Sequence, residues 1–418
     1  MLKSIRIGSA LLPFVLVAVS EANAQLPSAS TAALGMGDNF TAVARGYDAI
    51  AWNPALLGVR GGPARSLALG QFRIVTGLAP VTLGDIAEFE GEVVSLDARR
   101  RWLERIEANN GESGAGGAAV TWLAGHIGRF GVQLSTTGHA TAKLSPGAAE
   151  LFLFGNAGYL DGEPRALDID DSELRGSSIT TAALAYGQPF VTPAGTLSLG
   201  ATLKYGIGHF MIWGENHGSS ITADPTIDLR FPVVSTDGGV NNGSGFGLDL
   251  GVAFARDRLT LAAALENVFN TFEWKGQNLV YRPGTALLDG NASETDFEER
   301  AFTSAPADLR ARVHDARFNR VLRAGVAYDA TDALTLSADI HNRFGEPDFT
   351  GEPDFHAGAG AQYRVAPFLQ LRAGAAAITG GVMAGGGIGL RFGPVSLEAS
   401  LARRGDQTIG MGRAALTF

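Results

Sequence analysis

Apolar and polar residues alternate with a period of two over most of the C-terminal part of the chain. In the segment 334–341 the apolar residues stand at even positions and the polar residues at odd positions: Leu334, Leu336, Ala338 and Ile340 against Thr335, Ser337, Asp339 and His341. The segments 396–402 and 413–418 repeat the alternation. A period of two predicts β-strands that present one apolar and one polar face.

Segments of this kind recur from residue 65 onward, and we count about fourteen strands, an even number typical of bacterial outer-membrane barrels. The first seven are predicted at 65–74, 117–124, 130–140, 179–187, 196–205, 245–255 and 258–266. Two strands flank a turn at 329–333, and five more complete the chain. Short turns alternate with long connections through the first ten strands. This rhythm predicts a barrel with turns at one end and elaborated loops at the other.

The alternation itself is compatible with two environments. In a soluble sandwich or propeller the apolar faces meet in a core, whereas in a membrane barrel they face lipid and the polar faces line the lumen. A soluble fold does not require one-sided loops, and no propeller repeat of about 40–50 residues is visible. We therefore predict an all-β fold, a transmembrane antiparallel β-barrel of about 14 strands with an N-terminal hatch (plug) segment.

The N-terminus has the parts of a secretory signal peptide. Lys3 and Arg6 precede a short apolar run at 7–19, and the small-residue sequence ANA follows at 22–24. The run is too short to span a membrane, so we predict export through the inner membrane, cleavage after this sequence, and a location in the bacterial outer membrane. The predicted divisions of the chain are 1–24 signal peptide, 25–62 N-terminal hatch, and 63–418 barrel with long extracellular loops.

Composition narrows the class of protein. The 418-residue chain contains 56 glycines and no cysteine, which excludes a disulfide framework and a lipid-anchored cysteine. Only 18% of the residues are charged, and the net charge of -9 argues against a nucleic-acid partner, because phosphate binding needs a basic surface. No later apolar stretch is long enough for a transmembrane helix. These properties fit one large β-barrel.

Three segments outside the predicted strands carry local signals. In the hatch, Asn53 before Pro54 predicts a helical turn that begins with an N-cap and closes at Gly58. The first long connection, 75–116, contains a helical stretch that Ser95 caps, with apolar residues on one side: Leu96, Trp102, Leu103 and Ile106. The second long connection, 141–177, contains the apolar residues Leu151, Phe152, Leu153 and Phe154 and an acidic run.

With the apolar register turned outward, a set of polar and charged residues points into the barrel: Gln133, Lys204, Asp249, Glu266, Arg323, Asp339, His341, Arg343, Gln370, Arg372, Glu398 and Arg413. A charge that faces lipid costs a few kcal/mol near the bilayer midplane, which favours the lumen for these side chains. Both signs occur in similar numbers, so we interpret the charged members as a lumen charge network of ion pairs. A selective charged pore is the alternative. Inward glycines at 385, 387 and 389 allow close approach of another backbone.

The hatch sequence LGMGDNFTAVARGYDAIAWNPALLG resembles the outer-membrane superfamily of FadL-type long-chain fatty-acid transporters and PorV-type proteins of Bacteroidota secretion. Asn53, Pro54 and Ala55 match the Asn-Pro-Ala signature of this superfamily, and we interpret them as a plug anchor rather than as ligand contacts. The stretch LAAALENVFNTFEW at 261–274 and the helical insert near 96–106 are similar to an uncharacterised branch. The resemblance implies a barrel of about 14 strands that the hatch plugs.

The function that the resemblance implies is passive uptake of hydrophobic small molecules, long-chain fatty-acid-like or other apolar compounds. Such a molecule enters between the outer loops, passes the hatch, and leaves sideways through the wall or downward. In the transporters, apolar helices of two outer loops form a ligand groove, and the counterparts here by composition are Trp102, Leu103, Ile106, Phe152 and Phe154. Packing of loop on loop is the alternative for these residues. The alternative function is a PorV-type docking, shuttle or structural protein with no transport activity.

Enzyme chemistry has little support in the sequence. No His-Glu-x-x-His or Gly-x-Ser-x-Gly motif occurs, and the histidines show no metal-ligand spacing. Asp339 and His341 share a strand face, where a serine that approaches as in a lipase is the alternative to an ion pair. The acidic run lacks the spacing of a known calcium loop: Asp168, Asp170, Asp171 and Glu173. We predict no enzyme, no metal and no cofactor. The expected partners are outer-membrane lipid, a hydrophobic small molecule, and the barrel-assembly machinery through Phe418.

Overall fold

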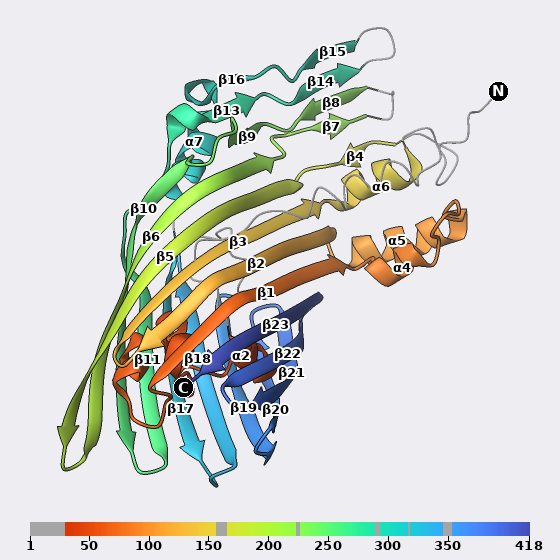
Figure 1. Ribbon diagram of the computed structural model, residues 1–418. Coiled ribbons are helices and arrows are strands. Elements are labelled where there is room, and N and C mark those ends of the chain that lie inside the picture. Colours follow the sequence, from red (N-terminus) through yellow and green to blue (C-terminus); the bar gives the residue numbers. More distant parts are fainter. Residues whose placement is uncertain (1–29, 156–164, 223–225, 289–292, 317, 346–352) are drawn as a thin grey trace.

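The structure is a computed structural model that describes residues 30–155, 165–222, 226–288, 293–316, 318–345 and 353–418. The predicted signal peptide lies outside these residues, so its cleavage stays a prediction. Helices are few among the described residues, and none has the length and apolar character needed to span a bilayer. Strands account for most of the described chain (Figure 1).

Fourteen antiparallel strands form one closed barrel (Figure 1). In chain order they are β1 (Arg65–Ala79), β2 (Glu112–Ile127), β3 (Phe130–Leu144), β5 (Glu173–Thr192), β6 (Gly195–Glu215), β10 (Gly243–Arg256), β11 (Leu259–Asn270), β17 (Arg320–Asp329), β18 (Leu334–Phe344), β19 (Phe355–Ala366), β20 (Leu369–Ile378), β21 (Gly381–Phe392), β22 (Val395–Arg404) and β23 (Gln407–Thr417). Each strand pairs with the next in this series, and β23 closes the barrel against β1, with Thr417 opposite Ser66. The predicted fold class and strand number are confirmed.

The strands are longer than the alternation predicts, chiefly toward the long loops. The alternation places a strand end at residue 205, whereas β6 continues to Glu215 and stays paired with β5 as far as Glu173. Met211 and Trp213 in this extension are buried against loop residues. Side chains on both faces of the extension meet protein, so a strict apolar-polar period is not needed there. The sequence prediction was therefore wrong about the length of these strands.

The long connections all leave from one end of the barrel, which we call the loop end. At the opposite end every connection is a short turn, and we call it the turn end. Between β1 and β2 lie α4 (Leu83–Ala87) and α5 (Leu96–Ala108), and between β3 and β5 lie α6 (Pro146–Phe154) and β4 (Leu167–Asp168). The β6–β10 connection contains β7 (Ser220–Ile221), β8 (Ile227–Arg230) and β9 (Val233–Thr236). The β11–β17 connection contains β12 (Glu273–Trp274), η4 (Gly276–Asn278), β13 (Leu279–Arg282), β14 (Thr285–Leu288), β15 (Ser293–Asp296), β16 (Arg300–Ala301), η5 (Phe302–Ser304) and α7 (Ala307–Asp315).

These connections extend the barrel wall at the loop end. The strands β15, β14, β8, β7 and β4 pair in this order into a separate small sheet (Figure 1). The inner surface of this sheet contacts α6 through Ile221 and Leu167, which pack with Leu151 of the helix. The predicted alternation of short turns and elaborated loops is therefore confirmed by the arrangement of the elements.

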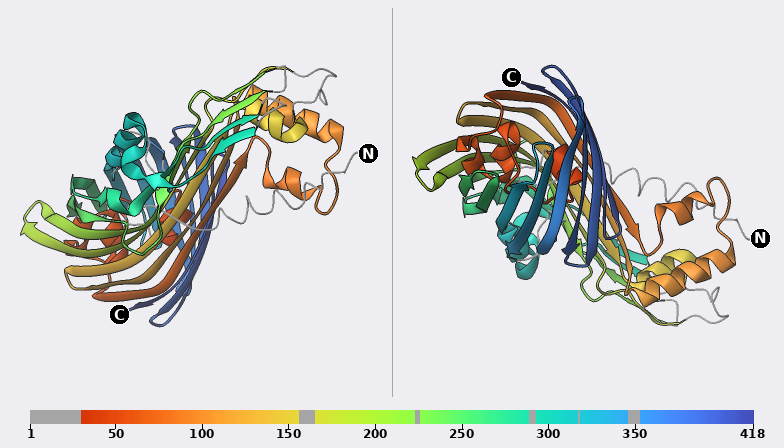
Figure 2. Two further views of the ribbon diagram at one scale, coloured as in Figure 1. Left: turned by 90° about the horizontal axis from the view of Figure 1, so that it is seen from above. Right: turned by 90° about the horizontal axis from the view of Figure 1, so that it is seen from below.

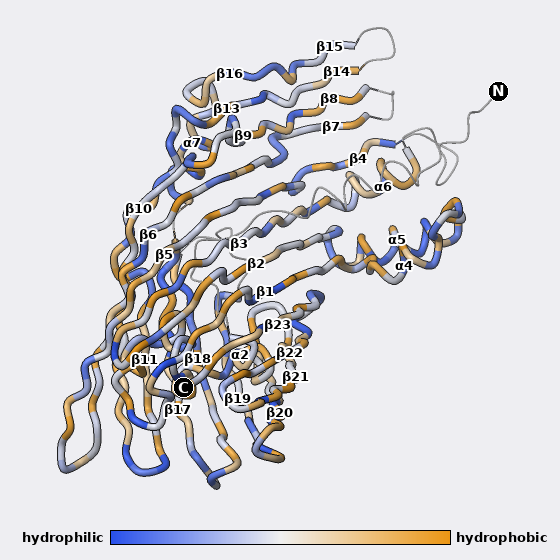
Figure 3. The backbone as a smooth tube through the Cα atoms, viewed as in Figure 1, coloured by the Kyte–Doolittle hydropathy of each residue, from blue (hydrophilic) through white to orange (hydrophobic). Residues whose placement is uncertain are grey.

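The outside of the barrel is an apolar belt between two aromatic bands. Many strands expose at least one leucine that is more than a third accessible, among them Leu184, Leu203, Leu250, Leu261, Leu322, Leu336, Leu371 and Leu397. Exposed aromatic residues gather near the turn end (Phe130, Tyr186, Tyr328, Tyr363, Phe368, Phe392 and Phe418) and nearer the loop end (Phe246, Phe269, Phe344 and Phe355). Hydrophobic and hydrophilic residues alternate along the strands in Figure 3. An apolar belt with aromatic girdles matches the two interfaces of a bilayer.

The hatch lies inside the barrel, where the strands surround it (Figure 2). It consists of α2 (Thr31–Gly35), η2 (Gly46–Asp48), α3 (Ala49–Trp52) and η3 (Pro54–Gly58). Phe40, Ile50, Trp52 and Leu56 of the hatch form a core with inward alanines of the wall. The small wall residues leave the room that these large hatch side chains fill.

Candidate functional site

The sequence Asn53-Pro54-Ala55 attaches the hatch to the barrel wall. Asn53 caps the turn Pro54–Gly58, because its Oδ1 accepts from Ala55 N at 3.0 Å, which confirms the predicted turn. The Nδ2 atom of the same side chain donates to the carbonyl oxygens of Val252 (3.2 Å) and Ala263 (3.0 Å). These two residues oppose each other in β10 and β11. One amide side chain thus joins the hatch turn to two wall strands.

The wall beneath this turn is bare backbone. Gly187, Gly200 and Gly251 are paired neighbours on β5, β6 and β10, and we call them the first glycine row. A Cβ atom on Gly200 would lie 2.2 Å from Ala55 N, and one on Gly251 would lie 2.1 Å from Asn53 Oδ1. Side chains at these positions would therefore collide with the backbone of the hatch turn or with the Asn53 side chain, so only glycine lets the turn reach the wall.

A second glycine row supports the end of α2. Gly360, Gly374 and Gly385 are paired neighbours on β19, β20 and β21. A Cβ atom on Gly374 would lie 1.9 Å from Met36 O, and one on Gly385 would lie 2.2 Å from the carbonyl oxygen of Leu34. The close backbone approach that the sequence predicts for Gly385 occurs, and the approaching backbone is the hatch.

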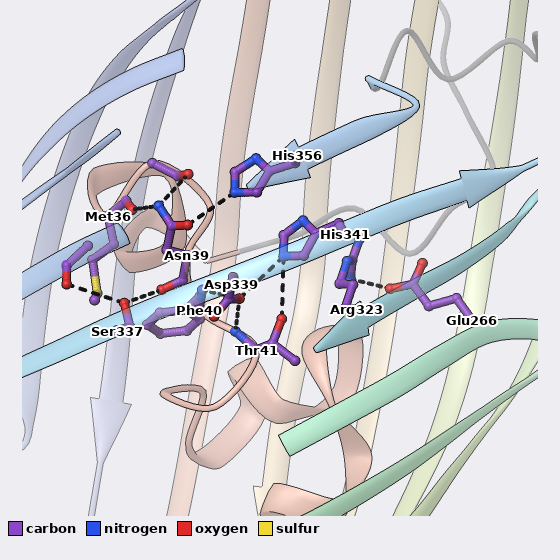
Figure 4. A network of polar contacts seen from close by, with 12 residues as sticks. Met36, Asn39, Phe40, Thr41, Glu266, Arg323, Ser337, Asp339, His341 and His356 are labelled. Carbon is purple, nitrogen blue, oxygen red and sulfur yellow. Dashed lines mark hydrogen bonds and ion pairs between the residues drawn. The ribbon is translucent and has the colours of Figure 1, made fainter. Parts of the chain in front are cut away.

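Asp339 of β18 holds the middle of the hatch (Figure 4). Its Oδ2 atom accepts from the backbone N–H groups of Phe40 at 2.9 Å and Thr41 at 2.7 Å. Ser337, two residues earlier on the same inward face, donates from Oγ to the carbonyl oxygen of Asn39 at 2.7 Å. The carboxylate is buried, so these charge-assisted bonds form away from bulk water. We call the contacts of Asp339 and Ser337 with residues 39–41 the hatch latch.

Two histidines extend the latch toward β19 (Figure 4). The imidazole rings of His341 and His356 stack with centroids 4.3 Å apart and an interplanar angle of 8°. His356 Nε2 lies 3.1 Å from Asn39 Oδ1, and Asn39 Nδ2 donates to Met36 O at 2.9 Å. The hatch segment therefore contacts β18 through Asp339 and Ser337 and contacts β19 through His356.

The lumen charge network resolves into discrete ion pairs. The ten predicted residues pair as follows: Lys204 with Asp249, Glu266 with Arg323, Asp339 with His341, Arg343 with Asp354, and Arg372 and Arg413 both with Glu398. The Lys204 and Asp249 side chains are only 3% and 5% exposed. At such burial an unpaired charge costs several kcal/mol, so removal of one partner is far more harmful than removal of both.

The sequence analysis missed the hatch carboxylate that joins this network. Arg413 donates to Asp48 at 2.8 Å as well as to Glu398 at 2.9 Å, and its guanidinium lies 5.2 Å from the centre of the Tyr47 ring. The guanidinium of Arg323 similarly lies 4.8 Å from the ring centre of hatch residue Trp52. The lumen charges therefore bind the hatch to the wall.

The geometry around His341 differs from that of a catalytic triad. Thr41 Oγ1 lies 3.4 Å from His341 Nε2, and Asp339 Oδ2 lies 3.3 Å from the same nitrogen. A triad histidine contacts its nucleophile and its carboxylate through different ring nitrogens. The same Asp339 oxygen also accepts the two hatch N–H groups, so this arrangement fits a latch.

The five residues predicted for the ligand groove lie in the connections α5 and α6. Trp102, Leu103, Ile106 and Phe154 are buried, and the first and third pack in a cluster with Ala149 of α6. The guanidinium of Arg99 lies over the Phe154 ring at 5.5 Å. Phe152 differs from the other four, because its side chain is 55% exposed. Leu96, predicted on the apolar side of this helix, is also exposed, at its first turn.

The pair Asp85–Arg105 holds α4 on α5 and gives this loop a pH dependence. Arg105 donates to both carboxylate oxygens, at 2.8 and 2.7 Å, and Thr82 donates to the same carboxylate from its backbone and its hydroxyl. The hydrogen bonds from Arg105, followed by those from Thr82, lower the pKa of Asp85 well below its usual range. A depressed folded-state pKa means that the pair stabilises the loop above the unfolded pKa and loses this effect as the pH falls through the folded pKa.

We therefore expect hydrogen exchange of residues 83–92 to accelerate below about pH 4, where the unfolded carboxyl begins to take up a proton. Asp85→Asn should exchange fast at neutral pH and lose this pH dependence. Asp97→Asn is the matched control, because Asp97 is 81% exposed and meets Arg100 only at 3.9 Å. Equal exchange of Asp85→Asn and the wild type at neutral pH would contradict the assigned role of the pair.

Two hollows adjoin the hatch. A cavity of about 620 Å³ opens at the turn end, between the hatch residues Arg45 to Asp48 and the strands β19 to β23. A depression of about 620 Å³ lies in the outer wall over β10, β11, β17 and β18, where the residues are almost all apolar and many are small: Val252, Ala253, Phe254, Leu261, Ala262, Ala263, Ala324, Gly325, Val326, Ala338, Asp339 and Ile340. Its wall strands are those that Asn53 and the hatch latch hold from inside.

Carboxylate and imidazole atoms converge once in the described part of the chain, at the loop end. Glu215, His217 and Asp308 place one ligand atom each within 4.8 Å of the others. Arg312 is paired with Glu215 and supplies a positive charge to the group. The predicted acidic run does not converge in this way, and its Glu173 pairs with Arg175 at 2.6 Å.

Comparison with known proteins identifies the family of the chain. The sequence of residues 66–399 matches a family of unknown function, DUF5723. The chain belongs to this family. The match begins just after the hatch and covers the barrel as far as the first half of β22, whereas the resemblance noted in the sequence lies mainly in the hatch. Among curated proteins, none matches the sequence significantly.

Solved structures show which fold this DUF5723 member has. The Ralstonia pickettii toluene transporter TbuX is 15% identical and aligns over 93% of this chain and 96% of its own, with a TM-score of 0.51. A deltaS2 mutant of the TodX monoaromatic hydrocarbon channel is 11% identical and aligns over 94% of this chain and 98% of its own, with a TM-score of 0.53. A Pseudomonas aeruginosa FadL homologue is 13% identical and aligns over 96% of this chain and 100% of its own, with a TM-score of 0.50. At these identities the likeness establishes the fold alone, which is the barrel fold of these hydrocarbon channels and of the FadL homologue.

Proposed function

We propose that the barrel takes up apolar small molecules passively across the outer membrane and that the hatch gates this passage. The proposal rests on the position of the hatch inside the barrel. The hatch contacts the wall at the two glycine rows and through the hatch latch. A molecule that crosses has to displace part of this segment. Structural neighbours described as a toluene transporter and a monoaromatic hydrocarbon channel support the class of cargo. Long-chain fatty-acid-like compounds belong to the same class.

The wall depression supports a sideways exit. Its outward residues include the alanines Ala263, Ala324 and Ala338 beside Leu261, so the outer surface of the wall is hollowed there. Asn53 donates to wall carbonyls on two of its strands, and Asp339 of a third holds Phe40 and Thr41. Release of the hatch from these strands would free the inner side of the same stretch of wall. Hydrophobic cargo then passes into the bilayer without crossing water.

Entry is assigned to the loop end. Phe152 is an exposed aromatic residue of the predicted groove, so it remains our candidate for first contact with the cargo. Trp102, Leu103, Ile106 and Phe154 would then act indirectly, because their packing fixes α6 against α5. The exposed surface of α6 would therefore bind the cargo first, and the buried residues would hold α6 in place for this contact.

Filling the depression should stop uptake. In Ala324→Trp an indole occupies the hollow from the lipid side, where no polar contact is disturbed, and uptake of radiolabelled toluene by intact cells should fall to the level of cells without the barrel. Ala373→Trp is the matched control, because Ala373 is an exposed belt residue of β20 outside the depression. Undiminished uptake with Ala324→Trp would rule out the sideways exit. A wild type that takes up no toluene and copurifies with a protein would favour the docking alternative.

Export and assembly complete the proposal. Removal of residues 1–24 by a signal peptidase would leave a chain that begins with the predicted hatch segment, 25–62. Phe418 pairs with Arg65 through both backbone groups and exposes its ring beside the strand that closes the barrel. A terminal aromatic in this position is available to the barrel-assembly machinery before closure.

A further inference from the structure

The cavity at the turn end has an excess of positive charge. Its charged lining residues are four arginines and two carboxylates: Arg45, Arg364, Arg391, Arg413, Asp48 and Glu398. Arg413 pairs with both carboxylates, and Arg372 also pairs with Glu398. Two guanidinium groups and two carboxylates thus neutralise one another. The remaining three arginines carry charges that this group does not balance.

None of these three arginines has a carboxylate within 4.0 Å among the residues that the structure describes. Arg45 donates to the carbonyl oxygens of Ala42 (3.0 Å) and Ala44 (2.9 Å) and to Thr260 Oγ1 (3.3 Å). Arg364 donates to Asp332 O, and Arg391 donates to Gly393 O at 3.3 Å. Each guanidinium keeps donors that neutral acceptors do not use. Arg45 is within electrostatic range of Asp329, whereas Arg364 and Arg391 line the cavity without a paired carboxylate among the described residues. An excess of positive charge around a partly enclosed space attracts an anion.

Apolar residues line the remainder of the cavity. Val365 belongs to the end of β19, and Pro367 and Phe368 form the turn that follows it. Tyr47 belongs to the hatch, and Pro63 follows the hatch. A cavity of about 620 Å³ has the size of an ordinary small-molecule site. The cationic and apolar surfaces together suit a ligand with one anionic group on a compact hydrophobic body.

We propose that the turn-end cavity is a binding site for a small amphipathic organic anion, a carboxylate on an aromatic or short aliphatic body. Arg45, Arg364 and Arg391 attract the carboxylate, and the apolar lining residues Tyr47, Pro63 and Pro367 contact the body. The site goes beyond the proposed uptake function, since it lies at the other end of the barrel from the loops and selects a charged molecule. Its ligand contacts the hatch through Arg45 and the barrel through Arg391, so binding stabilises the seated hatch.

Isothermal titration of the full barrel in non-ionic detergent tests this site with three probes. Phenylacetate should bind, whereas phenylacetamide, which has the same shape and no charge, should bind at least about tenfold more weakly. Acetate tests the apolar half of the site and should also bind more weakly. Higher ionic strength should weaken phenylacetate binding, because exposed charges are screened.

Two variants locate the site. Arg391→Gln, at a surface turn, should weaken phenylacetate binding about tenfold, and Arg45→Gln in the hatch should do the same. Arg403→Gln is the matched control, because Arg403 donates from Nε to Gly405 O in the manner of Arg391 but lies at the loop end of β22, outside the cavity lining. Added phenylacetate should also slow hydrogen exchange in residues 42–48 of the wild type.

Equal binding of phenylacetate and phenylacetamide would overturn the proposal, as would unchanged binding in both Arg391→Gln and Arg45→Gln. Toluene uptake separates this result from the proposed function. Arg391→Gln should take up toluene as the wild type does, so a failure of anion binding leaves uptake intact. A failure of uptake with normal phenylacetate binding would contradict the proposed function and leave the anion site standing.

Discussion

Gly385→Val should turn the sealed barrel into an open pore. A Cβ atom at this position would lie 2.2 Å from Leu34 O and 3.3 Å from Gly37 N, so the end of α2 has to leave the wall. The methyl groups of valine add further volume where packing is already complete, and overpacking of this kind costs about 1–3 kcal/mol. In planar bilayers the wild type should be almost silent, whereas the variant should show steady ionic conductance.

Gly386→Val is the matched control for this experiment. Gly386 is the next residue of β21 and faces the other side of the wall, where an added Cβ atom would meet only Arg372 O at 3.9 Å. Valine there should leave the barrel silent and is favoured by β-strand propensity. If Gly385→Val folds to the same barrel and remains as silent as Gly386→Val, the second glycine row does not hold the hatch.

Asp339→Ala should loosen the hatch from inside. The substitution removes the acceptor of two buried N–H groups, those of Phe40 and Thr41. A buried donor without a partner costs about 1–3 kcal/mol, so the two together cost at least about 2 kcal/mol. Hydrogen exchange of residues 36–46 should therefore accelerate about 30-fold or more, which is the factor that corresponds to about 2 kcal/mol. Asp339→Asn keeps one acceptor oxygen and should have a smaller effect.

Asp332→Ala controls for the loss of a carboxylate on the same hairpin. Asp332 lies at the β17–β18 turn, its side chain is 98% exposed, and its carboxylate pairs with Arg258 at the surface. Exposed pairs of this kind contribute about 0–1 kcal/mol, so hatch exchange should match the wild type. Wild-type exchange of residues 36–46 in Asp339→Ala would show that the carboxylate is not what holds the hatch.

The barrel follows from the sequence because its physical signal is local. The alternation at 334–341 indicates which face of β18 points outward from the barrel. Breaks in the alternation at the loops indicate where the strands end. The upper part of β6 shows where this signal ends. Residues 206–215 form the end of the strand where Met211 and Trp213 pack against loop residues, and the strict apolar-polar alternation does not continue there. Local pattern therefore predicted the membrane-spanning part of the strand and missed its extension.

The candidate site was only partly predictable, because some of its contacts depend on neighbouring residues in the sequence and others depend on the pairing of distant segments. The N-cap of Asn53 depends on its neighbours in sequence, so it could be predicted, and the inward position of Asp339 follows from strand register. The glycine rows depend on pairing between distant strands: Gly374 lies beside Gly360 and Gly385 only once β19, β20 and β21 are aligned. Asp48 could not be recognised as the partner of Arg413, because nothing in the sequence fixes the position of the hatch inside the barrel.

The claim that the hatch is a gate is tested most directly by locking it to the wall. The chain has no cysteine, and an added Cβ atom on Gly35 of α2 lies 2.9 Å from Ser400 Oγ of β22, so Gly35→Cys with Ser400→Cys places two sulfur atoms within bonding reach. Radiolabelled toluene uptake by intact cells should be lost when this pair is oxidised and should return on reduction, with each single cysteine variant unaffected. Uptake that is the same in the oxidised and reduced protein would contradict the gate and make the hatch a static plug.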